Sequence, residues 1–171
     1  MNYINRGKRD ILIIPKFNNI HKMQKIREKY DELFDIIEPH ITLAFPFKSD
    51  ISNEKLKQQL TDIIKNINPF RIKCKGIILR KDKIINTYYI FLNIVEGKEI
   101  IKEINHRIYE NILNNIDVKK YNYEPHITLG TTNNPNEKIE LNEEFETIVN
   151  SIVVEQIGEN EESIIEFEIN L

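Results

Sequence analysis

One six-residue segment occurs twice in this chain. Residues 38–43 and residues 124–129 both read Glu-Pro-His-Ile-Thr-Leu. Ile, Thr and Leu favour a strand, and proline is tolerated where a strand begins. Because side chains alternate between the two faces of a strand, each copy places its His and Thr on one face and its Ile and Leu on the other. Each copy therefore predicts a strand with one apolar face and one polar face.

The polar faces of the two copies carry His40 with Thr42 and His126 with Thr128. Two halves related by a pseudo-two-fold axis would bring all four groups to one point, and such a point suits a phosphate. In-line displacement at phosphorus needs a base, an acid and donors for the non-bridging oxygens. Histidine titrates near neutral pH and can supply either partner. A lone histidine would be read as an ordinary half-buried residue, but the identical repeat favours a catalytic pair.

Both copies contain a His-x-Thr-x tetrad, His-Ile-Thr-Leu at 40–43 and at 126–129. At these residues the chain resembles the two-histidine phosphoesterase superfamily. The chain length, the tetrad separation and the run Phe45-Pro46-Phe47 resemble its bacterial 2′-5′ RNA ligase-like branch. The resemblance implies one bilobal domain over residues 1–171, with a cleft between two similar lobes. It also implies cleavage of 2′,3′-cyclic or 2′-5′ phosphodiesters with neither a metal nor another cofactor.

Hydrophobic spacing along the first half predicts strands alternating with helices. Ser52 is a predicted N-cap, with Glu54 in the first turn of the helix that follows. The polar turn at 81–83 predicts a hairpin between its two flanking strands. The expected strands are residues 11–17, about 40–47, 70–79 and 87–95, and the expected helices follow residues 20 and 52.

The second half of the chain has the same order of alternating strands and helices. Ile100, Ile104, Ile108 and Ile112 step by four along a predicted helix, and a short helix is expected after Pro135. Residues 151–157 and 163–171 predict a closing hairpin. This order predicts an α+β fold of mainly antiparallel sheets with helices outside. The resemblance to the superfamily further implies two pseudo-symmetric lobes with a cleft between the sheets.

Composition restricts the partners. The net charge is −3 with a pI near 5.9, which argues against binding long nucleic acid because that needs a broad basic surface. A small nucleotide or an RNA end is the expected partner. The single cysteine, Cys74, excludes an intramolecular disulfide and predicts a core thiol. No apolar run is long enough to span a membrane, so we expect a cytoplasmic monomer without a membrane partner.

The alternation of side chains along the strands also identifies candidate substrate contacts. Arg71, Lys73 and Lys75 share one strand face, which either binds a polyanion or is simply solvated. Tyr89 and Phe91 share a face of the next strand, where they either stack on a base or pack within the sheet. The predicted substrate-binding residues are Arg71, Lys73, Tyr89, Phe47 beside the first motif and Tyr123 beside the second.

Three functions are consistent with the motifs. The first is a phosphodiesterase. His40 and His126 would be its acid and base, and the Thr42 and Thr128 hydroxyls would donate hydrogen bonds to the phosphate. The second is a nucleotide- or RNA-end-binding module without turnover. The third, a two-histidine metal site, lacks the third protein ligand that catalytic zinc usually has, so no metal ligands are predicted. The sequence leaves open the natural substrate and which histidine is the acid.

Overall fold

Two four-stranded antiparallel sheets and three helices make up the part of the chain that the computed structural model describes, residues 7–115 and 122–171. Sheet A has the strand order β2-β1-β7-β8, and sheet B has the order β5-β4-β3-β6. In chain order the elements are β1 (Arg9–Ile13), α1 (Ile20–Tyr30), β2 (Ile41–Phe47), α2 (Asn53–Ile64), β3 (Phe70–Lys81), β4 (Tyr88–Glu96), α3 (Lys98–Asn111), β5 (His126–Thr132), β6 (Phe145–Val149), β7 (Ser151–Ile157) and β8 (Ser163–Asn170).

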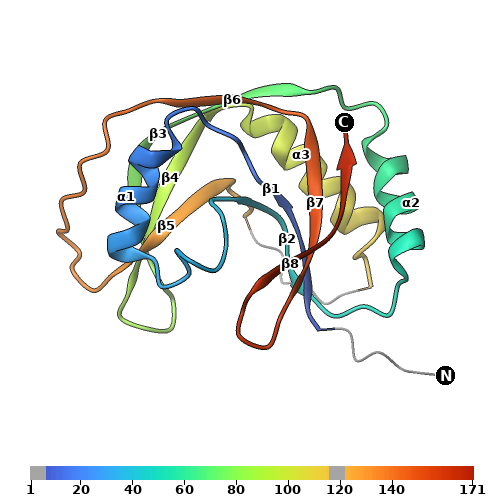
Figure 1. Cartoon of the computed structure of the whole chain (residues 1–171), viewed down its shortest axis with the longest axis horizontal. Coiled ribbons are helices and arrows are strands. Elements are labelled where there is room, and N and C mark those ends of the chain that lie inside the picture. Colours follow the sequence, from blue (N-terminus) through green and yellow to red (C-terminus); the bar gives the residue numbers. More distant parts are fainter. Residues whose placement is uncertain (1–6, 116–121) are drawn as a thin grey trace.

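The two sheets are built from the same unit. In β1-α1-β2 and in β4-α3-β5, a helix connects an inner strand to the edge strand that carries a repeated motif. Each helix leaves its own sheet and packs on the other one: α1 lies against β5, and α3 lies against β2. In Figure 1, α1 stands beside β4 and β5 at one end of the molecule, while α2 and α3 stand at the other end. The predicted α+β fold with two pseudo-symmetric lobes is confirmed.

The helices predicted after residues 20 and 52 and around residues 100–112 are present, with one change in the buried face of the last. The Ser52 hydroxyl caps α2 by accepting a hydrogen bond of 3.2 Å from the Lys55 amide, as expected. In α3 the buried side chains are Ile101, Ile104 and Ile108, whereas Ile100 is 38% exposed. Because a helix has 3.6 residues per turn, side chains spaced by four residues gradually turn away from one face. The buried face of α3 therefore begins at Ile101, one residue later than predicted.

Two predictions about the elements were wrong, and one strand was missed. β1 covers residues 9–13 rather than 11–17. No helix follows Pro135, where the chain makes only a short turn before a stretch without regular secondary structure. Sequence reasoning missed β6, because its short run buries only Phe145 and Val149. β6 exists because it pairs with the far-removed β3, from Phe70↔Val149 to Cys74↔Phe145.

A continuous hydrophobic core joins the helices to both sheets. Cys74 lies within it, as predicted, and burial raises the pKa of its thiol to about 12. Two backbone segments approach each other closely where α1 ends against β5: a Cβ added to Gly130 would overlap the backbone carbonyl of Tyr30. No helix of the described residues is long and apolar enough to cross a membrane.

Replacing Gly130 by alanine tests this contact. Gly130 has φ +133° and no room for a Cβ, so we expect Gly130→Ala to lower the free energy of unfolding by about 3 kcal/mol or more. Gly76 is the matched control: it has φ +86° but nothing within 4 Å of an added Cβ, so Gly76→Ala carries only the backbone cost of about 1 kcal/mol. Urea denaturation measures both, and equal losses would contradict the close approach of α1 to β5.

Candidate active site

The two repeated motifs meet because both lie on edge strands. β2 is the outermost strand of sheet A, β5 is the outermost strand of sheet B, and the two strands pack against each other. The Tyr123 hydroxyl, just before β5, donates a hydrogen bond of 2.7 Å to the Thr42 carbonyl in β2. This bond joins the segment before the second motif to the backbone of the first.

The two imidazoles are oriented in the same way. His40 Nδ1 lies 2.9 Å from the Glu38 carbonyl, and His126 Nδ1 lies 2.8 Å from the Glu124 carbonyl. A carbonyl can only accept, so each Nδ1 carries the proton and each Nε2 is left for proton transfer. The backbone therefore orients the imidazoles. The Glu38 and Glu124 side chains instead pair with lysines, namely Lys16, Lys98 and Lys102.

Burial shapes the protonation of both histidines. It lowers the pKa of His40 and of His126, and the carbonyl bonds only partly oppose this effect. His40 also lowers the pKa of His126, so the two rings are close enough to influence each other. Two half-buried imidazoles that influence each other and keep free Nε2 atoms have the composition of an acid–base pair.

Both threonines lie where the alternation predicts. Thr42 pairs with Leu12 of β1, and Thr128 pairs with Phe91 of β4. Each threonine shares a strand face with its histidine, two residues away. Each hydroxyl therefore lies on the same side of its strand as the imidazole, where it can donate a hydrogen bond.

Aromatic rings support the second histidine. The Phe91 ring stacks on His126 with a centroid separation of 3.6 Å, and Tyr89 stacks on Phe91 at 5.7 Å. The Arg80 guanidinium lies over the Phe91 ring, 5.7 Å from its centroid, and its charge lowers the pKa of His126. Sequence reasoning missed Arg80. The bulge between Cys74 and Ile77 shifts the alternation of β3, and Arg80 then pairs with Tyr89 on the cleft face.

A cavity of about 620 Å³ opens beside these rings. This volume is in the range of small-molecule sites. Nearly all of its walls come from sheet B and the segment before β5, and Phe45 is the only contribution from β2. His40 and Thr42 are not among its lining residues, which are Phe45, Arg80, Lys81, Asp82, Lys83, Ile84, Tyr89, Phe91, Asn122, Tyr123, Glu124, His126 and Thr128.

Two of the predicted substrate contacts reach this cavity. Tyr89 and Tyr123 both line it. Phe47 does not, because it is 5% exposed and packs in the hydrophobic core. The alternation of β2 is broken by a bulge opposite β1, and Phe45 takes the place in the cavity that we expected for Phe47.

Arg71 and Lys73 are not brought to the cavity either. Arg71 forms ion pairs of 2.9 Å with Glu96 and with Glu146. Lys73 lies within 3.8 Å of Glu144 and 3.7 Å of Glu146. Of the two predictions for this strand face, a solvated surface therefore fits better than a polyanion-binding surface. Carboxylates in and beside β6 and at the end of β4 already pair with its cations. Among the described residues, Arg80, Lys81 and Lys83 at the cavity make no ion pair.

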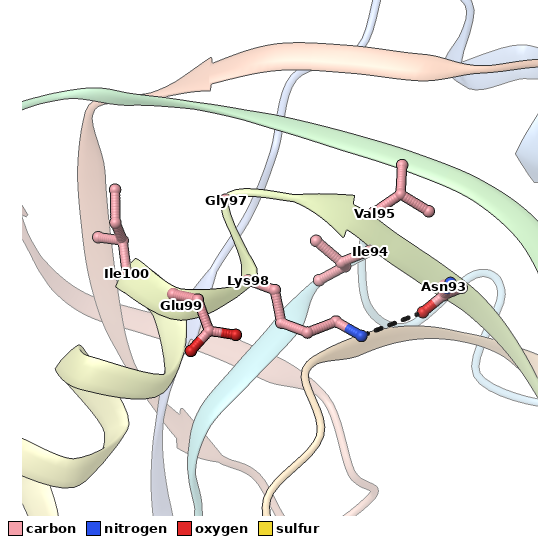
Figure 2. Close-up of a pocket in the computed structure, with 7 residues that line it drawn as sticks. All are labelled: Asn93, Ile94, Val95, Gly97, Lys98, Glu99 and Ile100. Carbon is pink, nitrogen blue, oxygen red and sulfur yellow. Dashed lines mark hydrogen bonds between the residues drawn. The ribbon is translucent and has the colours of Figure 1, made fainter.

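A second cavity, of about 540 Å³, lies where β4 turns into α3. Figure 2 shows the Lys98 side chain extending across it to Asn93, with Nζ 3.5 Å from Oδ1. Lys98 also pairs with Glu124, 3.4 Å away. This cavity thus lies beside the second motif, but its cation is already paired. Within residues 7–115 and 122–171, no three His, Cys, Asp or Glu side chains gather as a metal site would require.

Comparison with known proteins agrees with this geometry. The sequence pattern described as the 2′-5′ RNA ligase superfamily matches residues 15–160. A Geobacillus sp. (strain WCH70) protein named "Putative phosphoesterase" is 31% identical over 108 residues, which cover 61% of this chain and 57% of that protein. A relative of the same description from Geobacillus kaustophilus is 27% identical over 126 residues, covering 72% of this chain and 68% of its own length. The matched part thus spans little more than half to two thirds of these relatives.

Solved structures share the fold. Escherichia coli LigT complexed with 3′-AMP superimposes with a TM-score of 0.70 and 14% identity, covering 98% of this chain and 99% of that one. LigT complexed with NADP+ gives a TM-score of 0.68 at 13% identity, with the same coverage. A Thermus thermophilus structure gives 0.66 at 15% identity, covering 96% and 97%. At these identities the likeness concerns the fold.

Removing the Tyr123 hydroxyl tests the bond between the two motif regions. Tyr123→Phe leaves the Thr42 carbonyl without this donor, so we expect a loss of about 1–3 kcal/mol in the free energy of unfolding. Tyr88→Phe is the matched control, because the Tyr88 hydroxyl makes no hydrogen bond within the described residues. Chemical denaturation measures both variants. If Tyr123→Phe is no less stable than Tyr88→Phe, the bond does not hold the two regions together.

Proposed function

Because the chain belongs to the 2′-5′ RNA ligase superfamily, we propose that it is a metal-independent phosphodiesterase. Its proposed substrates are 2′,3′-cyclic or 2′-5′ phosphodiesters of RNA ends or small nucleotides. One observation carries the proposal: two imidazoles from identical motifs are held by matched Nδ1–carbonyl bonds and leave both Nε2 atoms for proton transfer. A module that only binds nucleotides has no need for two such groups.

The proposed reaction moves two protons. One histidine, neutral at Nε2, takes the proton of the attacking water or hydroxyl as its oxygen bonds to phosphorus. The other, protonated at Nε2, gives its proton to the oxygen that leaves. One P–O bond forms and one breaks, and each ring ends in the protonation state from which the other started. Such paired transfer typically contributes about 10²–10⁴-fold per group.

Thr42 and Thr128 are proposed to donate to the non-bridging phosphate oxygens, where negative charge grows during the displacement. Arg80 adds a positive charge beside His126, and it is not neutralised by a carboxylate of the described residues. The roles of the threonines are supported by their position on the same strand faces as the histidines. The role of Arg80 is supported by its contact with the Phe91 ring.

The cavity beside His126 is proposed to hold the nucleoside. The exposed side of the Tyr89–Phe91 stack offers a flat surface for a base, and such stacking contributes about 1–3 kcal/mol per base. LigT, which has the same fold, has been crystallised with 3′-AMP, ATP and NADP+. Those ligands make a small nucleotide a reasonable partner for this chain too.

The two histidines are tested together with a chelator. With excess EDTA present, His40→Ala and His126→Ala should each lower turnover of 2′,3′-cyclic and 2′-5′ substrates by about 10²–10⁴-fold, because each loses one proton-transfer partner. The wild-type rate should be unchanged by EDTA. His106→Ala, on the exposed side of α3, is the control and should retain full activity.

Two results would contradict this proposal. A metal-reversible loss of wild-type activity in EDTA would indicate that an ion generates the nucleophile. Tight nucleotide binding without turnover of any phosphodiester in the panel would instead identify a binding module.

The matched pair Arg80 and Arg71 tests where the phosphate lies. Both arginines belong to β3, but Arg80 lines the cavity and Arg71 is held by Glu96 and Glu146. We expect Arg80→Gln to lower kcat/KM about tenfold or more, since it removes a charge-assisted contact to the anion. Arg71→Gln should change kcat/KM less than about twofold. Equal losses in the two variants would show that the anion is not recognised at the cavity.

A further inference from the structure

Two acidic side chains are buried on the cleft-facing side of sheet A. Asp10 of β1 and Glu155 of β7 are register partners, and they are only 6% and 1% exposed. The next pair on that face is Leu12 with Val153, and Leu12 is in turn the partner of Thr42. Partners in an antiparallel ladder share a face, so the two carboxyls lie on the same face as the His40–Thr42 half-site. Nothing in the proposed reaction uses them.

The neighbouring Glu155 changes the protonation of Asp10. Burial, and then the charge of Glu155 and a hydrogen bond to it, raise the pKa of Asp10 to about 9. Glu155 accepts a further hydrogen bond from the Ser163 hydroxyl. Oδ1 of Asp10 is buried without a hydrogen-bond partner in the described part of the chain. At neutral pH Asp10 therefore keeps its proton beside the Glu155 charge.

That charge acts on His40. The charged groups that influence His40 are Glu155 of β7, Arg27 of α1 and Asp31 at the end of α1. Arg27 and Asp31 form an ion pair of 2.8 Å and act on the His40 pKa in opposite directions. Burial is the largest influence and lowers the His40 pKa, and Glu155 is the first of the charged groups that oppose it.

The opposite situation holds at His126. Its charged neighbours are Arg80 of β3 and His40 of the segment that enters β2, and both disfavour protonation of the ring. The Glu124 side chain, which could oppose them, is paired with Lys98 and Lys102 of α3. Two motifs of identical sequence therefore lie in electrostatic fields of opposite sign.

We propose that the buried Asp10–Glu155 pair is a positioning element that makes His40 the proton donor of the reaction and leaves His126 as the proton acceptor. The inference rests on the proposed phosphodiesterase function. In the protonation state that reacts, neutral His126 takes the proton of the attacking hydroxyl while His40, protonated at Nε2, gives that proton to the leaving oxygen. For a 2′-5′ diester, the nucleoside whose free hydroxyl attacks then occupies the cavity beside His126.

Two variants separate charge from packing. Asp10→Asn keeps the shape and a donor to Glu155, and it leaves the Glu155 charge in place. The double variant Asp10→Asn/Glu155→Gln keeps the shape and removes the charge. The double variant is needed because Asp10 could ionise once Glu155 alone is replaced. Thermal unfolding and circular dichroism establish that both variants are folded.

The primary readout is the NMR titration of the imidazole Cε1–H resonances, assigned with His40→Ala and His126→Ala. In the wild type, His40 should titrate at a higher pH than His126. The double variant should move the His40 midpoint down by about half a pH unit, as expected for one charge several ångströms away. His126 should move much less, and Asp10→Asn should leave both midpoints within about 0.2 units.

The pH profile of kcat/KM is the second readout. The acid form of His40 governs the alkaline limb, so the double variant should shift that limb to lower pH by the same half unit. Arg80→Gln should instead shift the acid limb to higher pH. A His40 midpoint that does not respond to the double variant, or that lies below His126 in the wild type, would overturn the inference. An NMR shift without any phosphodiesterase activity would instead contradict the proposed function and leave the electrostatic effect standing.

Discussion

The site depends on the contact between two edge strands. A strand at the edge of a sheet exposes unpaired backbone groups and must be covered. Here β2 and β5 cover each other, and the Tyr123 hydroxyl satisfies the Thr42 carbonyl across the junction. Because His40 and His126 begin or directly precede these strands, the same contact that protects the edges brings the imidazoles together. Any change that separates the strands would therefore separate the two imidazoles.

The exchange of helices between the lobes reinforces this arrangement. α1 starts from sheet A and packs on β5, while α3 starts from sheet B and packs on β2. Each motif strand is thus supported by a helix from the other half of the site. Arg27 of α1 adds a further tie, since it is buried and donates to the carbonyls of Leu33 and Ile37 in the segment that leads to His40. Neither half-site can shift without moving the support of the other.

Symmetry of the backbone does not extend to the charges. Both imidazoles use the same Nδ1–carbonyl bond and both lose proton affinity through burial. The surroundings then differ: a buried carboxyl pair lies on the His40 side, while Arg80 and the cavity lie on the His126 side. A duplicated scaffold thus supplies two equivalent side chains, and residues outside the repeat make them inequivalent. That difference would give a direction to the proposed proton transfer, which the motifs alone leave undirected.

Local sequence patterns were enough to identify most of the elements and the candidate reacting groups. Alternation in the repeated hexapeptide placed His40, Thr42, His126 and Thr128 on polar strand faces, and hydrophobic spacing located all three helices. These properties depend on residues a few positions apart. Long-range packing was needed to select the charged and aromatic side chains that serve the site. Arg71 and Arg80 belong to one strand, yet Glu146 of the distant β6 neutralises the first, and a bulge turns the second toward the cleft. The same holds for Phe47, for β6 and for the Asp10–Glu155 pair, since a side chain's field and burial are set by neighbours that the linear sequence does not place beside it.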